Sequence, residues 1–419
     1  MGEWKTYRLG DIIEIVSGFA YKGEYLGKGD KYLLGMGCVS FNEQFLEKGL
    51  RPYSGNCDKR YYAKDGDIVL ATRQQSDNMP ILGMPAIIPK KYKGKQMIVG
   101  ANLYRVINKS KDFSNDFIYW LLKSPDYVNY IKSCQTGTTV RMITKANIEN
   151  YTFICPSRES RLLISHFLWT LENKIELNRR INANLEAQAQ ALFRSWFVDF
   201  EPFRDGPFVD SQLGKIPNDF QIIKTGEIPM IITDFVANGS FASLKDNVTI
   251  LQEKDYAYFI RNVDLKDKKF ETYVNKHAYE FLSKSALFGN EIIISNVGDV
   301  GSVFLCPKLD RPMTLGNNII MLRPKESQML YYLYIWFKWF QGQSLIQGIK
   351  SGSAQPKFNK TDFKNLPIIL PPRTTLRAFH SIIEPFFNKI NFLTHENQIL
   401  SALRDTLLPK LIAGEIAIE

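Results

Sequence analysis

The sequence contains little that would build a cross-linked, metal-binding or membrane-spanning protein. It has five cysteines in 419 residues, and no two of them stand at C-x-x-C spacing. It therefore predicts neither a disulfide framework nor a zinc ribbon. The longest apolar stretch, 329–340, is interrupted by Lys338 and is shorter than the roughly 20 apolar residues of a membrane span. No basic-then-apolar signal peptide opens the chain. We expect a cytoplasmic protein with reduced thiols.

Motifs for catalysis are missing as well. The segment 23–28 is one residue short of a nucleotide-phosphate loop and lacks the Ser or Thr that should follow. The segment 35–40 is an incomplete G-x-G-x-x-G, and no Asp/Asn-Pro-Pro-Tyr/Phe motif is present to hold a flipped base. Three of the histidines lie on the segments expected to form long helices, where they read as ordinary surface or seam residues: His166, His380 and His395. His277 stands alone in the second globular part, without a local partner motif. We expect no catalytic residue, no metal site and no cofactor in this chain.

The charge and the apolar content indicate a different kind of protein. The net charge is +10, with 53 basic and 43 acidic residues, and 45% of the residues are hydrophobic. Residues 1–157 carry a balance of +7 and residues 220–372 one of +4, whereas 158–200, 201–219 and 373–419 stay near zero. A basic excess located in the globular parts favours a polyanionic partner such as nucleic acid.

An internal repeat is the main signal. Gly137 matches Gly352, an offset of 215 residues, and the same offset aligns Lys145 with Lys360. Further pairs at this offset include Asn102 with Asn317, Tyr119 with Tyr334, Lys123 with Lys338, Asn150 with Asn365, Pro156 with Pro371, and 173–175 with 388–390. Upstream the match needs a gap, which pairs 66–70 with 290–294. The chain is therefore expected to consist of two diverged halves.

Each half divides into a globular part and a long helix. The globular parts, 1–157 and 220–372, read as mixed α/β, with short β-type runs between turn signals. One aromatic helical segment lies in each, near 117–131 and near 330–346. Long helices are expected at 158–200 and 373–414, and the Pro- and Gly-containing segment 201–219 reads as an exposed linker.

The long helices show the 3.5-residue spacing of a coiled-coil seam. On the first helix, apolar residues recur from Ile164 to Trp196, with Asn178 and Asn182 between them. The second helix repeats the pattern from Phe379 to Leu411, and Asn397 stands where Asn182 does. A seam asparagine fixes register at some expense of stability. Pro385 is expected to start or kink the second helix. Packing of each helix on its own domain is the alternative.

These features together resemble the specificity subunit of type I restriction–modification systems. The resemblance rests on the tandem repeat, on the turns at 137–140 and 352–355, and on the helix segments 173–179 and 191–197. It implies two α+β target recognition domains, each followed by a long α-helix, with the helices paired as an antiparallel coiled coil in a pseudo-two-fold arrangement. Each domain would read one part of a split DNA site, and the helices would set the unread gap. Two methyltransferase subunits and restriction/translocase subunits would be the partners, and S-adenosylmethionine, ATP and Mg²⁺ would belong to them.

Polar loops after matching strands are the natural positions for contacts with bases. We predict that a set of polar and basic residues contacts DNA: Lys22, Arg73, Gln74, Gln75, Thr138, Thr139, Arg141, Lys145, Asn296, Lys350, Ser353, Gln355, Lys357 and Lys360. Among these, the lysines at 22, 145, 350 and 360 suit phosphates. An aromatic cluster at the end of the first helix is predicted either to dock a partner or to cap the core: Phe193, Trp196, Phe197 and Phe200.

Two other functions are compatible with parts of this pattern. A coiled-coil scaffold that binds only protein would show no salt-dependent affinity for DNA, whereas phosphate contacts make affinity fall steeply with salt. An enzyme with an unrecognised active site would turn over a substrate as the isolated chain. Neither accounts for a basic excess located in the globular halves.

Overall fold

The computed structural model describes residues 4–74, 81–352, 354–416 and 418. The chain divides into two compact units. Unit 1 comprises Met1–Asn178 and Glu396–Glu419, and unit 2 comprises Arg179–His395. Two long helices, α5 (Arg158–Phe197) and α12 (Arg373–Ala413), each contribute a segment to both units. The predicted helices at 158–200 and 373–414 are therefore present, and α12 continues through Pro385 instead of starting there.

Two four-stranded sheets and a separate strand pair form the framework of unit 1. The strand pair joins β1 (Lys5–Arg8) to β12 (Thr152–Cys155), which brings the start of the globular part to its end. The first sheet is antiparallel, in the order β2 (Ile13–Ser17), β10 (Leu103–Asn108), β6 (Ile68–Ala71) and β8 (Pro85–Ile87). The second is mixed, in the order β4 (Leu50–Tyr53), β3 (Leu26–Leu34), β9 (Met97–Val99) and β5 (Tyr62–Ala63).

Unit 2 repeats this topology strand by strand. Its strand pair is β15 (Gln221–Lys224) with β24 (Pro367–Leu370). Its antiparallel sheet has the order β16 (Met230–Asp234), β23 (Ile319–Pro324), β20 (Ile292–Ser295) and β21 (Val303–Leu305). Its mixed sheet has the order β18 (Tyr273–Val274), β17 (Ala257–Ile260), β22 (Met313–Leu315) and β19 (Ala286–Leu287). In both mixed sheets one pair is parallel, β3 with β9 and β17 with β22. The two-fold internal repeat is thus present in the fold.

Three short helices of each unit follow the 215-residue offset. In unit 1 they are α2 (Asn115–Lys123), α3 (Pro125–Cys134) and α4 (Lys145–Glu149). In unit 2 they are α9 (Leu330–Lys338), α10 (Phe340–Gly348) and α11 (Lys360–Lys364). Each predicted aromatic helical segment is therefore two helices. In unit 1 the break falls at Ser124, whose hydroxyl accepts from the backbone N–H of Tyr127 while Pro125 takes the first helical position.

One part of the predicted alignment is wrong. The structural counterpart of Asn102 is Asn318 and not Asn317. The carbonyl of Asn102 accepts the backbone N–H of Thr72, the residue directly after β6. In the same way, the carbonyl of Asn318 accepts the backbone N–H of Asn296, the residue directly after β20. The connection from β10 to α2 is one residue longer than that from β23 to α9.

By contrast, the predicted gap upstream, which pairs 66–70 with 290–294, is confirmed. Gly66 and its counterpart Asn290 both have positive φ, +80° and +67°.

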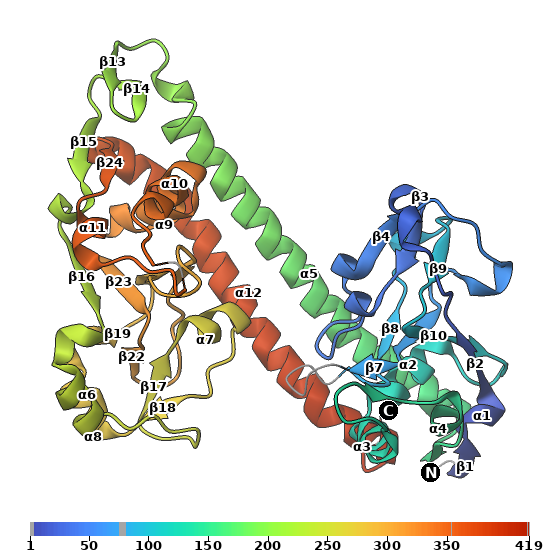
Figure 1. The fold of residues 1–419 in the computed structure, drawn as a ribbon. Helices are drawn as coiled ribbons and strands as arrows, with labels where there is room; N and C mark the ends of the chain where they lie inside the picture. The colour runs from blue at the N-terminus through green and yellow to red at the C-terminus, as the bar shows by residue number, and fades with distance from the viewer. Residues whose placement is uncertain (1–3, 75–80, 353, 417, 419) are drawn as a thin grey trace. The chain divides into compact units, whose positions relative to one another are not determined.

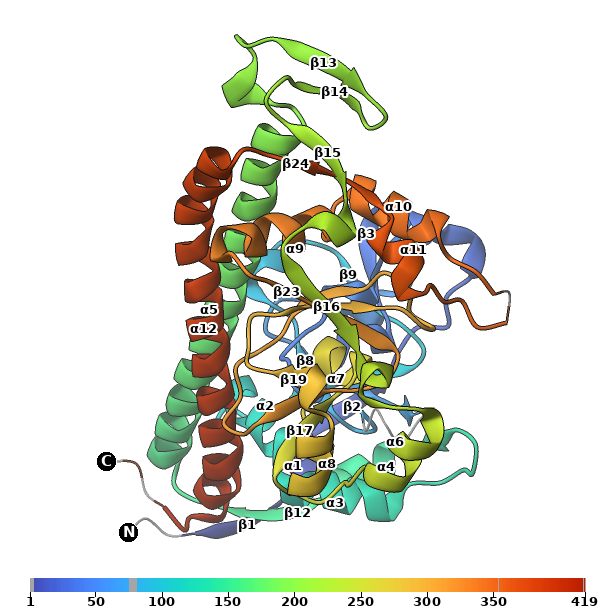
Figure 2. The same ribbon diagram turned by 90° about the vertical axis from the view of Figure 1, so that its left-hand side faces the viewer.

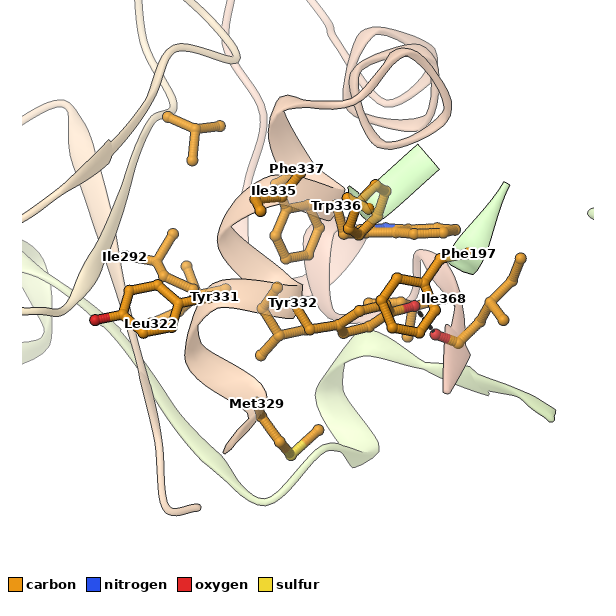
Figure 3. Packing of buried hydrophobic residues seen from close by; sticks show 14 of the residues in the cluster. Phe197, Ile292, Leu322, Met329, Tyr331, Tyr332, Ile335, Trp336, Phe337 and Ile368 are labelled. Atoms are coloured by element: carbon orange, nitrogen blue, oxygen red, sulfur yellow. Dashed lines mark hydrogen bonds between the residues drawn. The ribbon is translucent and has the colours of Figure 1, made fainter. Parts of the chain in front are cut away.

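Aromatic residues dominate the core of unit 2. Phe197 of α5 lies against Tyr332 of α9 and Phe379 of α12, with ring centroids 4.8 Å apart in both cases. Figure 3 shows Phe197 beside Tyr332, with Trp336 on the same helix. The buried hydroxyl of Tyr332 donates to the carbonyl of Ile369 in β24. Burial raises the pKa of Tyr332 well above its usual value, so the hydroxyl stays protonated and can keep this bond.

The predicted linker is partly ordered. It forms a hairpin of β13 (Phe208–Ser211) and β14 (Gly214–Pro217) in unit 2, which precedes β15 (Figure 2). Ile216 is buried in the unit 2 core, and Phe200 packs on Phe208 with ring centroids 5.9 Å apart. Apolar contacts of this kind explain why the segment adopts a defined conformation although its composition favours an exposed connection. In the described part of the chain, none of the helices contains an apolar run of the length that a membrane span requires.

Within each unit, the segments of α5 and α12 pack antiparallel (Figure 1). In unit 1, Asn178 donates through Nδ2 to Glu396 (2.6 Å) and to Asn397 (2.9 Å), and Asn397 donates to the carbonyl of Ile175 (3.3 Å). In unit 2, Asn182 donates to Thr394 at 3.3 Å. The seam asparagines predicted from the sequence therefore bond across the pair, which is the arrangement that fixes register.

A buried ion pair lies in the unit 1 part of the seam. Arg404 of α12 donates to Glu172 of α5 at 2.5 Å, and the two side chains are 7% and 1% exposed. Arg404 also contacts Asp405 at 2.8 Å. Two charges this deeply buried are stable only as a pair, because each loses its hydration on folding.

We predict that R404M lowers the free energy of unfolding by about 3–5 kcal/mol, because it leaves the Glu172 carboxylate buried without its partner. The double variant E172M/R404M, in which both charges are replaced by side chains of similar volume, should recover most of this loss. Urea denaturation followed by tryptophan fluorescence measures both. Equal losses in the single and double variants would contradict the account.

Candidate nucleic-acid interface

In unit 1 the connection after β6 is joined to a hairpin. In the connection, Arg73–Gln74 forms β7, which pairs antiparallel with β11 (Arg141–Met142) of the hairpin. The hairpin closes between Thr136 and Met142, whose backbone N–H and C=O groups bond reciprocally at 3.0 and 2.8 Å. These two segments are 60 or more residues apart in the sequence, and the sheet brings them together.

The same arrangement recurs in unit 2. Ser351 and Lys357 bond reciprocally through their backbones at 2.8 and 2.9 Å. Lys357 also bridges to Val297, in the connection after β20. The N–H of Gly298 donates to the carbonyl of Pro356 at 2.9 Å. We call this combination the loop–hairpin site. It comprises the described residues of the connection after β6 or β20 and of the hairpin Thr136–Met142 or Ser351–Lys357.

Glycine is required at one position of each hairpin. Gly137 has φ +93°, and a Cβ there would lie 2.2 Å from the carbonyl oxygen of Val140. Gly352 has φ +84°, and a Cβ there would lie 2.8 Å from the carbonyl oxygen of Gln355. Side chains rarely adopt this backbone region, and neither approach leaves room for one. The structure therefore explains why these two glycines align in the repeat.

The loop–hairpin sites contain most of the predicted base-contacting residues. In unit 1, Arg73, Thr138 and Thr139 are exposed and Arg141 is half-buried. In unit 2, Gln355 and Lys357 are exposed and Asn296 is half-buried, with Nδ2 donating to the carbonyl of Phe358. Gln74 is buried, and its Oε1 accepts the N–H of Leu82 at 3.3 Å, so this carboxamide helps to hold the connection. Gln75 and Ser353 lie outside the described residues.

The four predicted phosphate-binding lysines are in different surroundings. Lys22 and Lys350 are exposed, the former in the turn before β3 and 3.9 Å from Glu24. Lys145 and Lys360 are the first residues of the equivalent helices α4 and α11. Lys360 is bound to Asp234 at 2.8 Å and is 30% exposed. No such ion pair is described for Lys145. The two equivalent lysines therefore differ in how far their charge is already neutralised.

Two arginines on the antiparallel sheets are held in structural ion pairs. Arg105 of β10 contacts Asp67 at 2.8 Å, and Arg323 of β23 contacts Glu291 at 2.8 Å. Both carboxylates are buried, with exposed fractions of 9% and 2%. These guanidinium groups stabilise the strand ends beside β6 and β20, so their charge is not free to bind a polyanion.

The aromatic cluster at the end of α5 needs a correction. Phe193, Phe197 and Phe200 are buried in the unit 2 core and are covered by residues of this chain. They cap the core, which was one of the two roles expected, and do not form a docking surface. Trp196 is half-buried against Phe379 and Phe203, and a docking role for it stays a prediction.

Sequence reasoning missed a polar group in unit 2. Asp299 lies in the connection after β20, and its carboxylate accepts hydrogen bonds from Ser302 and Asn262. Asn262 and Lys266 belong to α7 (Asn262–Asp267), which follows β17. Asp299 stands between two glycines after a β-type run, the same signal that selected Asn296. The contribution of α7 depends on a tertiary contact and leaves no local signal in the sequence.

The fold and the site define a class: a protein with two equivalent α+β units, each presenting one polar loop–hairpin site, joined by two long helices. The family model for the type I restriction modification DNA specificity domain matches residues 1–187 and 198–402. The chain belongs to this family.

Two relatives and one solved structure are similar to the chain over nearly its whole length. The chain is 26% identical to the type I restriction enzyme MjaIX specificity subunit of Methanocaldococcus jannaschii, covering 100% of this chain and 94% of the relative. It is 25% identical to the HindI specificity subunit of Haemophilus influenzae, covering 99% and 100%. The crystal structure of a type I restriction–modification S subunit from M. genitalium has the same fold, with a TM-score of 0.61 at 16% identity over 98% and 96% of the two chains.

We predict that G137V destabilises unit 1 by about 1–3 kcal/mol, because a β-branched residue is forced into a left-handed conformation and against a carbonyl oxygen. Thermal unfolding measures the loss. G23A in the same unit is the matched control, since a Cβ there meets no atom within 4 Å and φ is not positive. A G137V protein as stable as G23A would show that the hairpin is not held as described.

Proposed function

We propose that this chain is the sequence-specific DNA-binding subunit of a type I restriction–modification complex. Each unit reads one part of a split duplex site, and α5 and α12 set the length of the unread gap. The observation that carries this proposal is the repetition of one loop–hairpin site in both units of a chain that belongs to the DNA specificity family.

The chemistry of the sites supports base reading. Arg or Lys recognises guanine through two acceptors of the major groove, and Asn or Gln recognises adenine through a donor and an acceptor. Arg73, exposed in unit 1, suits the first pattern, and Gln355, exposed in unit 2, suits the second. Because both side chains project from hairpin-tied backbone, they lose less conformational freedom on binding than side chains on an unrestrained loop would.

The long helices suit the role of a spacer. α5 has 40 residues, which corresponds to about 60 Å at 1.5 Å per residue. This length exceeds one turn of duplex DNA, about 34–36 Å, so two sites on such a frame would leave unread base pairs between them. Register along the helix pair would then fix the gap, and the polar bonds of Asn178 and Asn182 support a single register.

The chain itself is proposed to be non-catalytic. Its relatives carry the name of specificity subunits, and such a subunit would direct the enzymes that assemble with it. We propose two methyltransferase subunits and the restriction/translocase subunits as partners, with S-adenosylmethionine, ATP and Mg²⁺ bound by them. The cytoplasmic location expected from the sequence belongs to the same proposal. A protein-only scaffold gives no reason for two sites whose exposed side chains suit the reading of bases.

Selection of bound duplexes from a random library tests this function directly. The chain would be purified with its methyltransferase partner, because the sites act in that complex. A split motif with a fixed unread gap is the expected result. Exchanging residues 1–157 for the equivalent part of a relative should then change one half of the motif only. A pool without any motif would contradict base reading and favour the scaffold.

We predict that R73A relaxes the selected motif at one base pair of the half-site read by unit 1, with a loss of roughly 1–3 kcal/mol in discrimination. R180A removes the same charge from an exposed position on α5 and should leave the motif unchanged. Binding measured on single-base variants of the selected duplex gives both values. Loss of affinity without a change of motif in R73A would assign Arg73 to a phosphate.

A second prediction concerns the equivalent lysines. K145A should make the negative slope of log K against log salt less steep by about 0.9, the value for one phosphate contact. K360A should change the slope by less, because Lys360 is already bound to Asp234. Titrations at several salt concentrations measure the slopes. Equal changes in both variants would show that DNA takes Lys360 away from Asp234.

A further inference from the structure

The connection after β20 forms a closed loop in unit 2. The N–H of Gly301 donates to the carbonyl of Ser295, and the N–H of Ser295 donates to the carbonyl of Ser302, both at 2.9 Å. One side of the loop is tied to the hairpin by the bond from Gly298 to Pro356. Asp299 follows Gly298 directly, so its backbone is fixed beside the hairpin at the loop–hairpin site.

The two oxygens of the Asp299 carboxylate are in different environments. Oδ2 accepts from Ser302 Oγ at 2.9 Å and from Asn262 Nδ2 at 3.4 Å, and it lies 3.5 Å from Lys266 Nζ. Oδ1 has no hydrogen-bond partner among the residues that the structure describes. The side chain is 44% exposed. One oxygen is thus anchored, and the other is left to accept a bond from outside the chain.

The carboxylate is ionised at neutral pH. The hydrogen bond from Ser302, together with the bond from Asn262 and the ammonium group of Lys266, lowers the pKa of Asp299 below its ordinary value. An ionised carboxylate only accepts hydrogen bonds. It is also repelled by DNA phosphates, so an exposed carboxylate at a DNA site weakens binding unless a donor of the bases reaches it.

The major groove offers two kinds of donor, the N4 amino group of cytosine and the N6 amino group of adenine. Adenine presents its N7 acceptor beside N6, and a carboxylate oxygen would be repelled there. Cytosine presents only the donor. Resting on the function proposed above, we propose that Asp299 is a base-reading residue of unit 2, whose free Oδ1 accepts a hydrogen bond from N4 of a cytosine. Asn262 is then a positioning residue that orients the carboxylate.

The proposal is tested with the complex of the chain and its methyltransferase partner. Duplexes are selected with the wild-type protein, with D299N and with D246N. Asp246 is exposed on α6 (Phe241–Asn247) of the same unit, so D246N removes the same charge away from the site. The wild-type motif should contain a C·G pair at which D299N loses between roughly fivefold and a hundredfold of discrimination. That pair should lie in the half-site that does not change when residues 1–157 are exchanged.

The outcomes separate this proposal from the function on which it rests. A wild-type motif that D299N leaves unchanged, or changes only at an A·T pair, would overturn the cytosine assignment and leave the function standing. A wild-type pool with no motif would overturn both. If D299N does not fold, N262A supplies the test, since it removes one of the bonds that orient the carboxylate without changing its charge. Discrimination at the same C·G pair should then fall, while thermal unfolding reports whether the unit is intact.

Discussion

Each unit depends on the antiparallel packing of α5 against α12. In unit 1, Leu408 and Leu411 of α12 complete a core that contains Ile164 and Leu168 of α5. In unit 2, Phe193 and Phe197 of α5 complete a core that contains Phe379 of α12. Neither half of the repeat therefore encodes a complete core. The two halves must stay in one chain, or in two copies that exchange helices, for either site to be presented.

The fold could be predicted from the sequence to the extent that it is periodic. The 215-residue offset aligns α4 with α11, and Lys145 and Lys360 are the first residues of these two helices. The spacing of the seam predicts the buried apolar side chains of α5 between Ile164 and Ile175. It does not select Phe193 and Phe197, which are also buried. Insertions are where the prediction fails. One additional residue before α2 shifts the partner of Asn102 to Asn318, because a loop length carries no periodic signal.

The site could be predicted only where polar residues follow a strand or a glycine turn. Arg73 and Lys357 were found by that rule, and the structure places each in a loop–hairpin site. Composition misled at Phe197, since an aromatic cluster at a helix end predicts a core and an interface equally well. The anchoring of Asp299 could not be predicted, because Asn262, 37 residues earlier in the chain, reaches it from the helix α7. Pairings of that kind are set by tertiary packing alone.

The most direct test is to map the residues of the chain that DNA covers. Hydrogen–deuterium exchange would be compared for the complex with and without its selected duplex. We expect DNA to slow exchange in both hairpins, 136–142 and 351–357, and in the connection 296–301. Slowing confined to one unit, or to the mixed sheets at β3–β4 and β17–β18, would contradict the claim that the chain presents two equivalent reading sites.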